Sequence, residues 1–301
     1  LWNQQSKLIA SDGAAGDIFG EKVSIHQERL IVSARGDDTS TGAAYIFLRD
    51  GCPANCTWTA ESKITLSNSG IYHHFGAAVS ISNDRVLVST FNSAYVFELF
   101  GCPSNCMWIE QAGLVAYDQV NNQFFGWSAV ISGDNILVGA RRDNEAGPDS
   151  GATYTYEFSG GDWSLNSKLY SIDSGDSRFA LESVIDGGTA LIGSGYNSNG
   201  IYANSVSVLE NIGGIWSRQT SLSSASVSTT DAFGSSLALD GDSALVGAYL
   251  DDDQGADAGS AYLFSLVNGV WAQQEKFVAS DAASSDFFGY SLSIDGDTAV
   301  I

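Results

Sequence analysis

The side chains best suited to chemistry in this sequence are carboxylates, and the densest group lies in one short stretch. Asp251, Asp252, Asp253 and Asp257 fall within seven residues. Carboxylate oxygens are the ligands that Ca²⁺ prefers, so Asp251, Asp253 and Asp257 are the candidate metal ligands, with calcium as the candidate ion. The alternative is structural, because Asp in a turn often accepts hydrogen bonds from its own backbone. No cofactor is required by either interpretation.

Similar acidic stretches follow other apolar segments and could face a ligand. The candidate ligand-facing residues are Asp37, Asp38, Asp143, Glu145, Asp149 and Asp252. A second set of acidic stretches holds Asp12 and Asp17, Asp173 and Asp176, and Asp281 and Asp286. If both sets are loops of one repeating architecture, they emerge on the same face, and we expect that face to be acidic.

No catalytic set is recognisable in the sequence. The three histidines are His26, His73 and His74, and none has a Ser or Cys partner in an arrangement typical of a triad. No Gly-rich phosphate loop precedes a helix. The carboxylates are repeated rather than singular, so we expect a protein that is not an enzyme.

The four cysteines occur in two copies of a short insert, Gly-Cys-Pro-x-Asn-Cys, at 51–56 and 101–106. Each insert can close its own loop, and this favours an oxidising, extracellular setting. A four-Cys zinc site is the alternative, and it would need both inserts to converge on one ion. The predicted disulfides are Cys52–Cys56 and Cys102–Cys106.

Two further short motifs have a functional reading. Asn55-Cys56-Thr57 is a glycosylation sequon, so Asn55 is a candidate for glycan attachment, although it lies inside a constrained loop. Arg35-Gly36-Asp37 is a tripeptide that some integrins bind. It lies where the repeat pattern itself requires Gly and Asp, so we interpret it as a coincidence.

The elements that position these residues are internal repeats. A Phe, followed by Gly in all copies but one, recurs at 19, 75, 125, 179, 233 and 288, and a Trp recurs at 2, 58, 108, 163, 216 and 271. Successive landmarks are 50–56 residues apart. This is the spacing of propeller blades of four strands each.

Hydrophobic patterns predict the place of each strand in a repeat. The second strands, such as Arg29–Ala34 and Ser243–Ala248, are almost continuously apolar and should be buried on both faces. The fourth strands alternate, as in Trp58–Ile64, and should be outermost. A Lys lies five residues after the Trp in four copies, at 7, 63, 168 and 276. Alternation places these lysines on the outward side, where they would discourage edge-to-edge pairing.

The predicted fold is therefore all-β, a single β-propeller domain spanning 1–301. Six blades of four antiparallel strands are expected, or seven if the chain is truncated. The repeats cover about 19–66, 75–116, 125–170, 179–222 and 233–279, and the closing blade combines 288–301 with 1–8. The third strand of that closing blade is missing from the sequence.

The repeats resemble the FG-GAP family, which forms the propeller head of integrin α-subunits and many secreted propellers. The resemblance rests on the Phe-Gly pairs, on Val-Gly-Ala at 138–140 and 246–248, and on Gly-x-Ala-Tyr openings at Gly42 and Gly259. It implies a fold and no single activity. Integrin-like repeats often carry a calcium loop between strands one and two. Here that loop is only a short turn, at 132–135, 240–243 and 295–298, with too few oxygens for calcium.

The net charge of the chain limits the classes of partner that it can bind. Thirteen Lys and Arg against 35 Asp and Glu give a net charge of −22. Polyanions are repelled by such a chain, so we expect no binding to nucleic acid or anionic lipid. No apolar run approaches 18 residues, so we expect no membrane insertion. The chain begins inside a repeat, and we expect it to be part of a larger polypeptide or assembly.

These observations favour a non-catalytic extracellular adhesion or structural module that binds proteins in a matrix, at a cell surface or in an appendage. One alternative is a lectin-like propeller, which would show exposed pairs of an aromatic and a polar residue. Tyr249 with Asp251 and Tyr196 with Asn197 are the only such pairs. Another alternative is an accessory domain of a secreted enzyme. The expected partner is an extracellular protein or a glycan.

Overall fold

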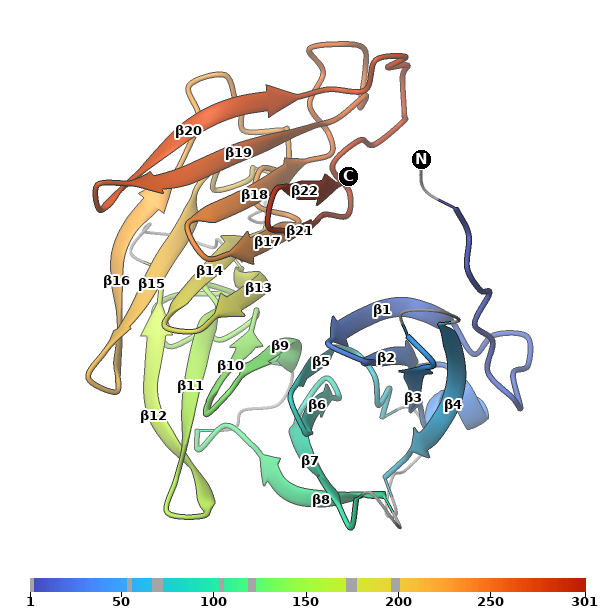
Figure 1. Ribbon diagram of the computed structural model, residues 1–301. Coiled ribbons are helices and arrows are strands. Elements are labelled where there is room, and N and C mark those ends of the chain that lie inside the picture. Colours follow the sequence, from blue (N-terminus) through green and yellow to red (C-terminus); the bar gives the residue numbers. More distant parts are fainter. Residues whose placement is uncertain are drawn as a thin grey trace. The chain divides into compact units, whose positions relative to one another are not determined.

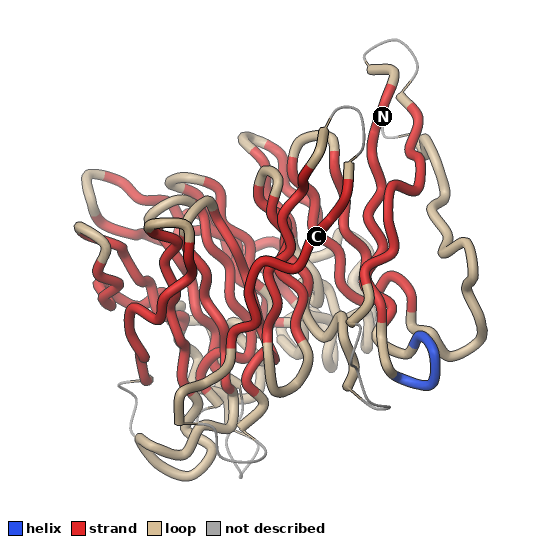
Figure 2. The backbone as a smooth tube through the Cα atoms, turned by 90° about the horizontal axis from the view of Figure 1, so that it is seen from below, coloured by secondary structure: helices blue, strands red, loops and turns tan. Residues whose placement is uncertain are grey.

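The computed structural model describes residues 3–52, 56–66, 73–102, 106–118, 123–171, 178–195 and 201–301. Strands dominate these residues, which contain one short helix, drawn in blue in Figure 2. That helix, α1 (Asp37–Ser40), is one turn, with left-handed backbone at Asp38 and Thr39. The all-β prediction is confirmed. No helix in the described part of the chain is long and apolar enough to span a membrane.

The strands form five sheets of four strands each, and in every sheet the strands lie side by side in chain order (Figure 1). In the first sheet, β1 pairs with β2, β2 with β3 and β3 with β4, all antiparallel. The strands are β1 (Phe19–His26), β2 (Arg29–Ala34), β3 (Ala43–Asp50), β4 (Thr57–Ile64), β5 (Val79–Ser82), β6 (Arg85–Ser89), β7 (Ala94–Phe100), β8 (Met107–Leu114), β9 (Phe125–Ser132), β10 (Asn135–Ala140), β11 (Ala152–Ser159), β12 (Asp162–Tyr170), β13 (Phe179–Asp186), β14 (Thr189–Ser194), β15 (Val206–Ile212), β16 (Ile215–Leu222), β17 (Leu237–Asp240), β18 (Ser243–Ala248), β19 (Ser260–Val267) and β20 (Val270–Phe277).

The predicted number of blades is wrong, because the described residues form five four-stranded blades and not six or seven. Residues 288–301 supply only the hairpin of β21 (Ser293–Asp295) and β22 (Thr298–Val300), which form a two-stranded sheet. Residues 3–8, the expected fourth strand of the closing blade, form no strand. A fourth strand needs a third strand to hydrogen-bond with, and neither segment provides one.

The chain divides into two compact units. One comprises Leu1–Gln119 with Phe125–Asp134, and the other comprises Val120–Phe124 with Asn135–Ile301. Each unit is described by itself below. The single-domain organisation stays a prediction.

The Phe of the repeat motif is fully buried in four of its six copies, and Phe19 and Phe288 are half-buried. Phe75, Phe125, Phe179 and Phe233 are all at most 1% exposed. In the second unit, Phe233 packs edge-on against Tyr262 and Phe264, with ring centroids 5.4 and 6.3 Å apart. The aromatic residues of the third strand therefore hold the Phe of their own blade.

Close backbone contacts between neighbouring repeats explain the Gly that precedes the third strand. Gly259 forms a parallel bridge with Phe288 and has a φ of +85°. A Cβ at Gly259 would lie 2.2 Å from the carbonyl oxygen of Phe288, so only Gly fits there. Gly42 meets Phe75, and Gly151 meets Phe179, in the same way.

The short Gly-Asp turns are hairpin turns that also connect neighbouring blades. In the second unit the carboxylate of Asp186 accepts a hydrogen bond from Gly241 N at 2.7 Å, and that of Asp240 accepts one from Gly296 N at 2.6 Å. In the first unit the Ser82 hydroxyl accepts the same bond from Gly133 N at 3.0 Å. The acidic side chains of these turns therefore accept hydrogen bonds from backbone N–H groups of the neighbouring blade.

Candidate functional site

The acid that follows the second strand is buried in three blades. Asp37, Asp143 and Asp251 are 3%, 0% and 2% exposed. A buried carboxylate is costly unless hydrogen bonds and a positive charge compensate it. Each of the three has such partners, and the group formed by the acid with its Lys and Tyr is called an Asp–Lys–Tyr centre here.

The centre of the fifth blade is built on Asp251. Its Oδ1 accepts a bond from Asp253 N at 3.0 Å, and its Oδ2 accepts bonds from the hydroxyls of Ser260 and Tyr262 at 2.7 and 3.0 Å. Lys276 Nζ lies 2.8 Å from the same Oδ2 and 2.6 Å from Asp253 Oδ2. Burial alone would raise the pKa of Asp251, but the bonds from Lys276 and Ser260 outweigh it and hold the pKa below its usual value.

The centre of the third blade is the most buried. Lys168 Nζ lies 2.7 Å from Asp143 Oδ2 and 2.9 Å from Glu145 Oε2, and the Lys168 side chain is only 4% exposed. The Tyr154 hydroxyl donates to Asp143 Oδ2 at 3.1 Å. The ammonium also lies 5.0 Å from the centre of the Tyr154 ring.

The first unit contains the third centre. Lys63 Nζ lies 2.7 Å from carboxylate oxygens of both Asp37 and Asp12, and the Tyr45 hydroxyl donates to Asp12 at 2.7 Å. The bond from Lys63 lowers the pKa of Asp12. Burial and the neighbouring carboxylate of Asp12 raise the pKa of Tyr45 above its usual range.

The prediction that these lysines point outward is wrong, and a β-bulge is the reason. Lys63, Lys168 and Lys276 lie directly opposite Tyr45, Tyr154 and Tyr262 on the neighbouring strand. Each fourth strand carries one extra residue before the Lys, which shifts the register. One extra residue reverses the alternation of a strand. The bulge therefore turns the Lys inward, onto the same face as the Trp.

The candidate calcium ligands are arranged around Lys276. Its ammonium occupies the space between the carboxylates of Asp251 and Asp253. Asp257 lies apart from this pair, and its backbone N–H donates to Asp252 Oδ1 at 2.8 Å. Within the described ranges, no group of three His, Cys, Asp or Glu side chains could hold a metal ion. Calcium binding stays a prediction.

The remaining acidic candidates have separate surroundings. Asp38 is exposed in the left-handed turn of α1. Asp149 is half-buried with a φ of +48°, and its N–H donates to the side chain of Asn144. Asp37 of the Arg-Gly-Asp tripeptide is buried in its centre, and Arg35 pairs with Glu21. The Arg-Gly-Asp tripeptide is therefore not exposed in a form that an integrin could bind.

Loops that enter a repeat also use their acids locally. Asp17, Asp231 and Asp286 each accept a hydrogen bond from the backbone N–H three residues earlier, at 2.6–2.8 Å. These bonds fix the turn before the Phe-Gly motif. Asp173 and Asp176, like Tyr196 and Asn197, lie outside the described residues.

Clusters of partly exposed aromatic rings are the feature that sequence reasoning missed. In the second unit, Tyr249 packs edge-on against Phe287 and Tyr290, with centroids 6.0 and 5.2 Å apart. Phe287 is 39% exposed and Tyr290 is 70% exposed. In the first unit, Phe91 stacks on Trp127 at 5.5 Å and contacts His74. The available signal was an aromatic on each side of Phe-Gly, as in Phe287-Phe288-Gly289-Tyr290.

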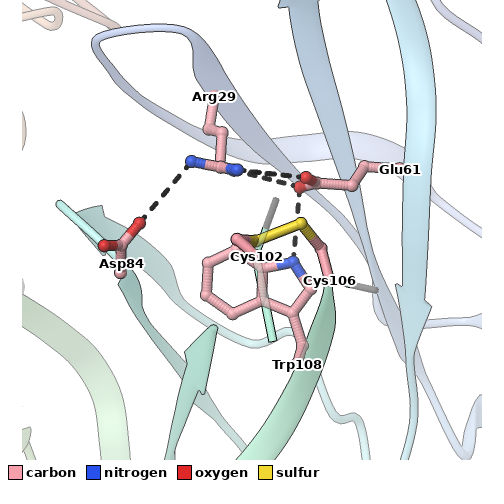
Figure 3. Close-up of a disulfide and its surroundings, with 6 residues drawn as sticks. All are labelled: Arg29, Glu61, Asp84, Cys102, Cys106 and Trp108. Atoms are coloured by element: carbon pink, nitrogen blue, oxygen red, sulfur yellow. Dashed lines mark hydrogen bonds and ion pairs between the residues drawn. A yellow bond between two sulfur atoms is a disulfide. The ribbon is translucent and has the colours of Figure 1, made fainter. Parts of the chain in front are cut away.

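Both predicted disulfides are confirmed. Cys52–Cys56 and Cys102–Cys106 are bonded, at S–S distances of 2.07 and 2.10 Å, so no Cys remains for zinc. Asn55 lies outside the described residues. Figure 3 shows the polar network beside the second disulfide, where Arg29 donates to Glu61 and Trp108 donates to the same carboxylate at 3.3 Å. Glu61 is the bulge residue of β4, and it joins the first two blades of the first unit.

Comparison with known proteins agrees with this architecture. An FG-GAP repeat family model matches residues 2–47, 58–97, 108–156, 216–264 and 271–301. No curated protein matches the chain. A solved candidate 6-phosphogluconolactonase from Bacteroides uniformis ATCC 8492 matches with a TM-score of 0.58 at 11% identity, covering 86% of this chain and 71% of its own. A functionally unknown protein from Desulfotomaculum acetoxidans DSM 771 matches with a TM-score of 0.54 at 13% identity, covering 91% and 74%. At these identities the structures share the fold alone.

Proposed function

Because the chain belongs to the FG-GAP repeat family, we propose that it is a non-catalytic extracellular module that binds other proteins in a matrix, at a cell surface or in an appendage. The observation that carries this proposal is the exposed aromatic cluster of Tyr249, Phe287 and Tyr290. Exposed aromatic side chains supply much of the binding free energy at protein interfaces.

The acidic loops are less suited to this role than their composition suggests. The buried acids Asp143 and Asp251 are bound by a Lys and a Tyr of their own blade, so they are not offered to a partner. Two disulfides support the extracellular part of the proposal, because such bonds persist in oxidising compartments.

A glycan is the second candidate ligand, and the same cluster favours it. Tyr249, Phe287 and Tyr290 present ring faces and edges on which a sugar can pack, and exposed carboxylates such as Asp252 lie in the loop that follows Tyr249. The pair of Tyr249 with Asp251 does not serve this purpose, because Asp251 is buried.

The test compares a Tyr290→Ala variant with the unmodified chain in two assays. One is capture of proteins extracted from the surface on which the chain naturally occurs, and the other is binding to a glycan array. Val270→Ala is the matched control, because Val270 is 65% exposed at the start of β20 and is not part of the aromatic cluster. We expect Tyr290→Ala to lose a captured protein that Val270→Ala retains. Loss of an array signal instead would favour the glycan. Equal capture by all three proteins contradicts the proposed role of the cluster.

A further inference from the structure

Arg142 is a positive side chain without an acidic partner among the described residues. Seven other cations do form ion pairs, namely Arg29, Arg35, Arg49, Arg85, Lys63, Lys168 and Lys276. Arg142 forms none with any described residue, and its Nε is buried without a hydrogen-bond partner there. In a chain of net charge −22, an unpaired cation calls for an explanation.

A second guanidinium lies against the same aromatic ring as that of Arg142. The Cζ atoms of Arg141 and Arg142 are 5.1 and 4.9 Å from the centroid of the same ring, Phe124. Two positive charges on one ring repel each other, and the repulsion weakens when an anion lies between or beside them. The ring stabilises each cation but accepts no in-plane hydrogen bond.

The acids of the same loop do not neutralise Arg142. Asp143 and Glu145 are held by Lys168. Asp149 forms no ion pair within the described chain, and its backbone carbonyl accepts a bond from Arg178 N at 3.0 Å. Arg178 is thus a third arginine whose backbone borders this loop. Both Arg142 and Phe124 are half-buried, so the group is accessible to a ligand yet shielded from bulk water.

We propose that Arg142, with Arg141 beside it on Phe124, binds a carboxylate presented by an acidic side chain of a partner protein. A guanidinium presents parallel N–H donors that match the two oxygens of a carboxylate. This inference names a ligand class for the proposed interaction module and therefore rests on the proposed function.

The net charge favours a protein carboxylate over a polyanion. A sulfated polysaccharide carries dense charge, which the whole acidic surface repels. A protein segment presents one or two carboxylates among neutral side chains. At physiological ionic strength, charges more than about 8 Å away are largely screened, so the local arginines dominate for such a segment.

The experiment titrates the full chain with two capped tetrapeptides that differ only by Glu or Gln at one position. The Arg142 Nε–H resonance reports occupancy directly. We expect the Glu peptide to bind about tenfold more tightly than the Gln peptide, the difference that one charge-assisted pair provides. Arg142→Gln should abolish that difference. Arg49→Gln should retain it, because Arg49 also lies over an aromatic ring, at 5.9 Å from Trp58, but already pairs with Glu28.

Three results would overturn the inference: equal binding of both peptides, an unchanged difference in Arg142→Gln, or tighter Arg142-dependent binding of a sulfated disaccharide. A failure of the proposed function can be distinguished from a failure of the carboxylate site by the capture experiment. If the chain captures a protein through Tyr290 and Arg142→Gln changes neither peptide titration, the protein-binding function is supported and the carboxylate site is refuted. If nothing is captured, the module itself fails, whatever the peptides show.

Discussion

Replacing Lys168 by Met is the sharpest test of the Asp–Lys–Tyr centres. The variant keeps the volume of the side chain and leaves Asp143, 0% exposed, without its cation. Removing one partner of a buried ion pair typically costs 3–5 kcal/mol, because the remaining charge is uncompensated. The bond from the Tyr154 hydroxyl remains, so we expect a loss of about 3 kcal/mol in the free energy of unfolding.

Urea unfolding followed by tryptophan fluorescence measures this loss. Arg49→Gln is the control for loss of a positive charge, and it should lower the free energy of unfolding much less than Lys168→Met, because its pair with Glu28 is exposed to solvent. In the double variant Lys168→Met with Asp143→Asn, the buried charge is absent and at least half of the stability should return. The reasoning is refuted if Lys168→Met costs no more than Arg49→Gln, or if adding Asp143→Asn lowers stability further.

Three other predictions follow from the geometry. The folded pKa of Asp251 is lowered from 3.8, so its contribution to stability is complete above about pH 4 and should disappear as pH falls through the folded pKa, which urea midpoints between pH 5 and 2 would show; an Asp251→Asn variant should lack this component. Gly259→Ala should destabilise the chain by more than 2 kcal/mol, since its Cβ would collide with backbone, whereas Gly269→Ala, with a similar φ and open space around it, should cost only about 1 kcal/mol; equal midpoints would contradict the close contact. Reduction of the two disulfides should lower the free energy of unfolding by at most about 2 kcal/mol each, because each closes a very short loop; alkylation with mass analysis checks that reduction is complete, and global unfolding on reduction would refute the prediction.

The blades were predictable from sequence because their pattern repeats a physical constraint. Phe179 and Gly151 recur as a buried ring and a close backbone approach, and both are readable from spacing alone. The number of blades was not readable in the same way. Residues 3–8 match the pattern of the other fourth strands, but a strand forms only where a neighbouring strand offers hydrogen bonds, and that depends on the rest of the sheet.

The direction of the lysines was unpredictable from alternation, because one bulge residue reverses the strand faces after it. A different signal was present. In the four-stranded blades, the Lys occurs where an acid follows the second strand. In the second blade, Thr90 replaces the acid and Gly113 faces Tyr95 where Lys would stand. Paired loss of two distant residues indicates contact, and it would have placed Lys63 beside Asp37.

The aromatic clusters were missed for another reason. An aromatic residue in a strand pattern is usually a core residue, and Phe125 and Phe233 are indeed buried. The rings flanking Phe-Gly differ because the residue before the buried Phe has a positive φ, as at Phe124 and Phe287. That conformation turns its side chain away from the one that follows, and sequence patterns carry no record of φ.

The buried acid, the Lys and the Tyr of each Asp–Lys–Tyr centre come from a single repeat. In the third blade, Asp143, Glu145, Tyr154 and Lys168 lie within 26 successive residues. Neighbouring blades contact one another through backbone atoms and through buried apolar side chains. A duplicated or transplanted repeat therefore carries the residues that hold its loop, whereas its new neighbours must supply the backbone contacts and the apolar packing between blades. In such a repeat the exposed loop positions can vary, because the buried Asp, Lys and Tyr hold the loop in place. This modularity can be used by grafting residues 141–170 into the corresponding repeat of a related protein.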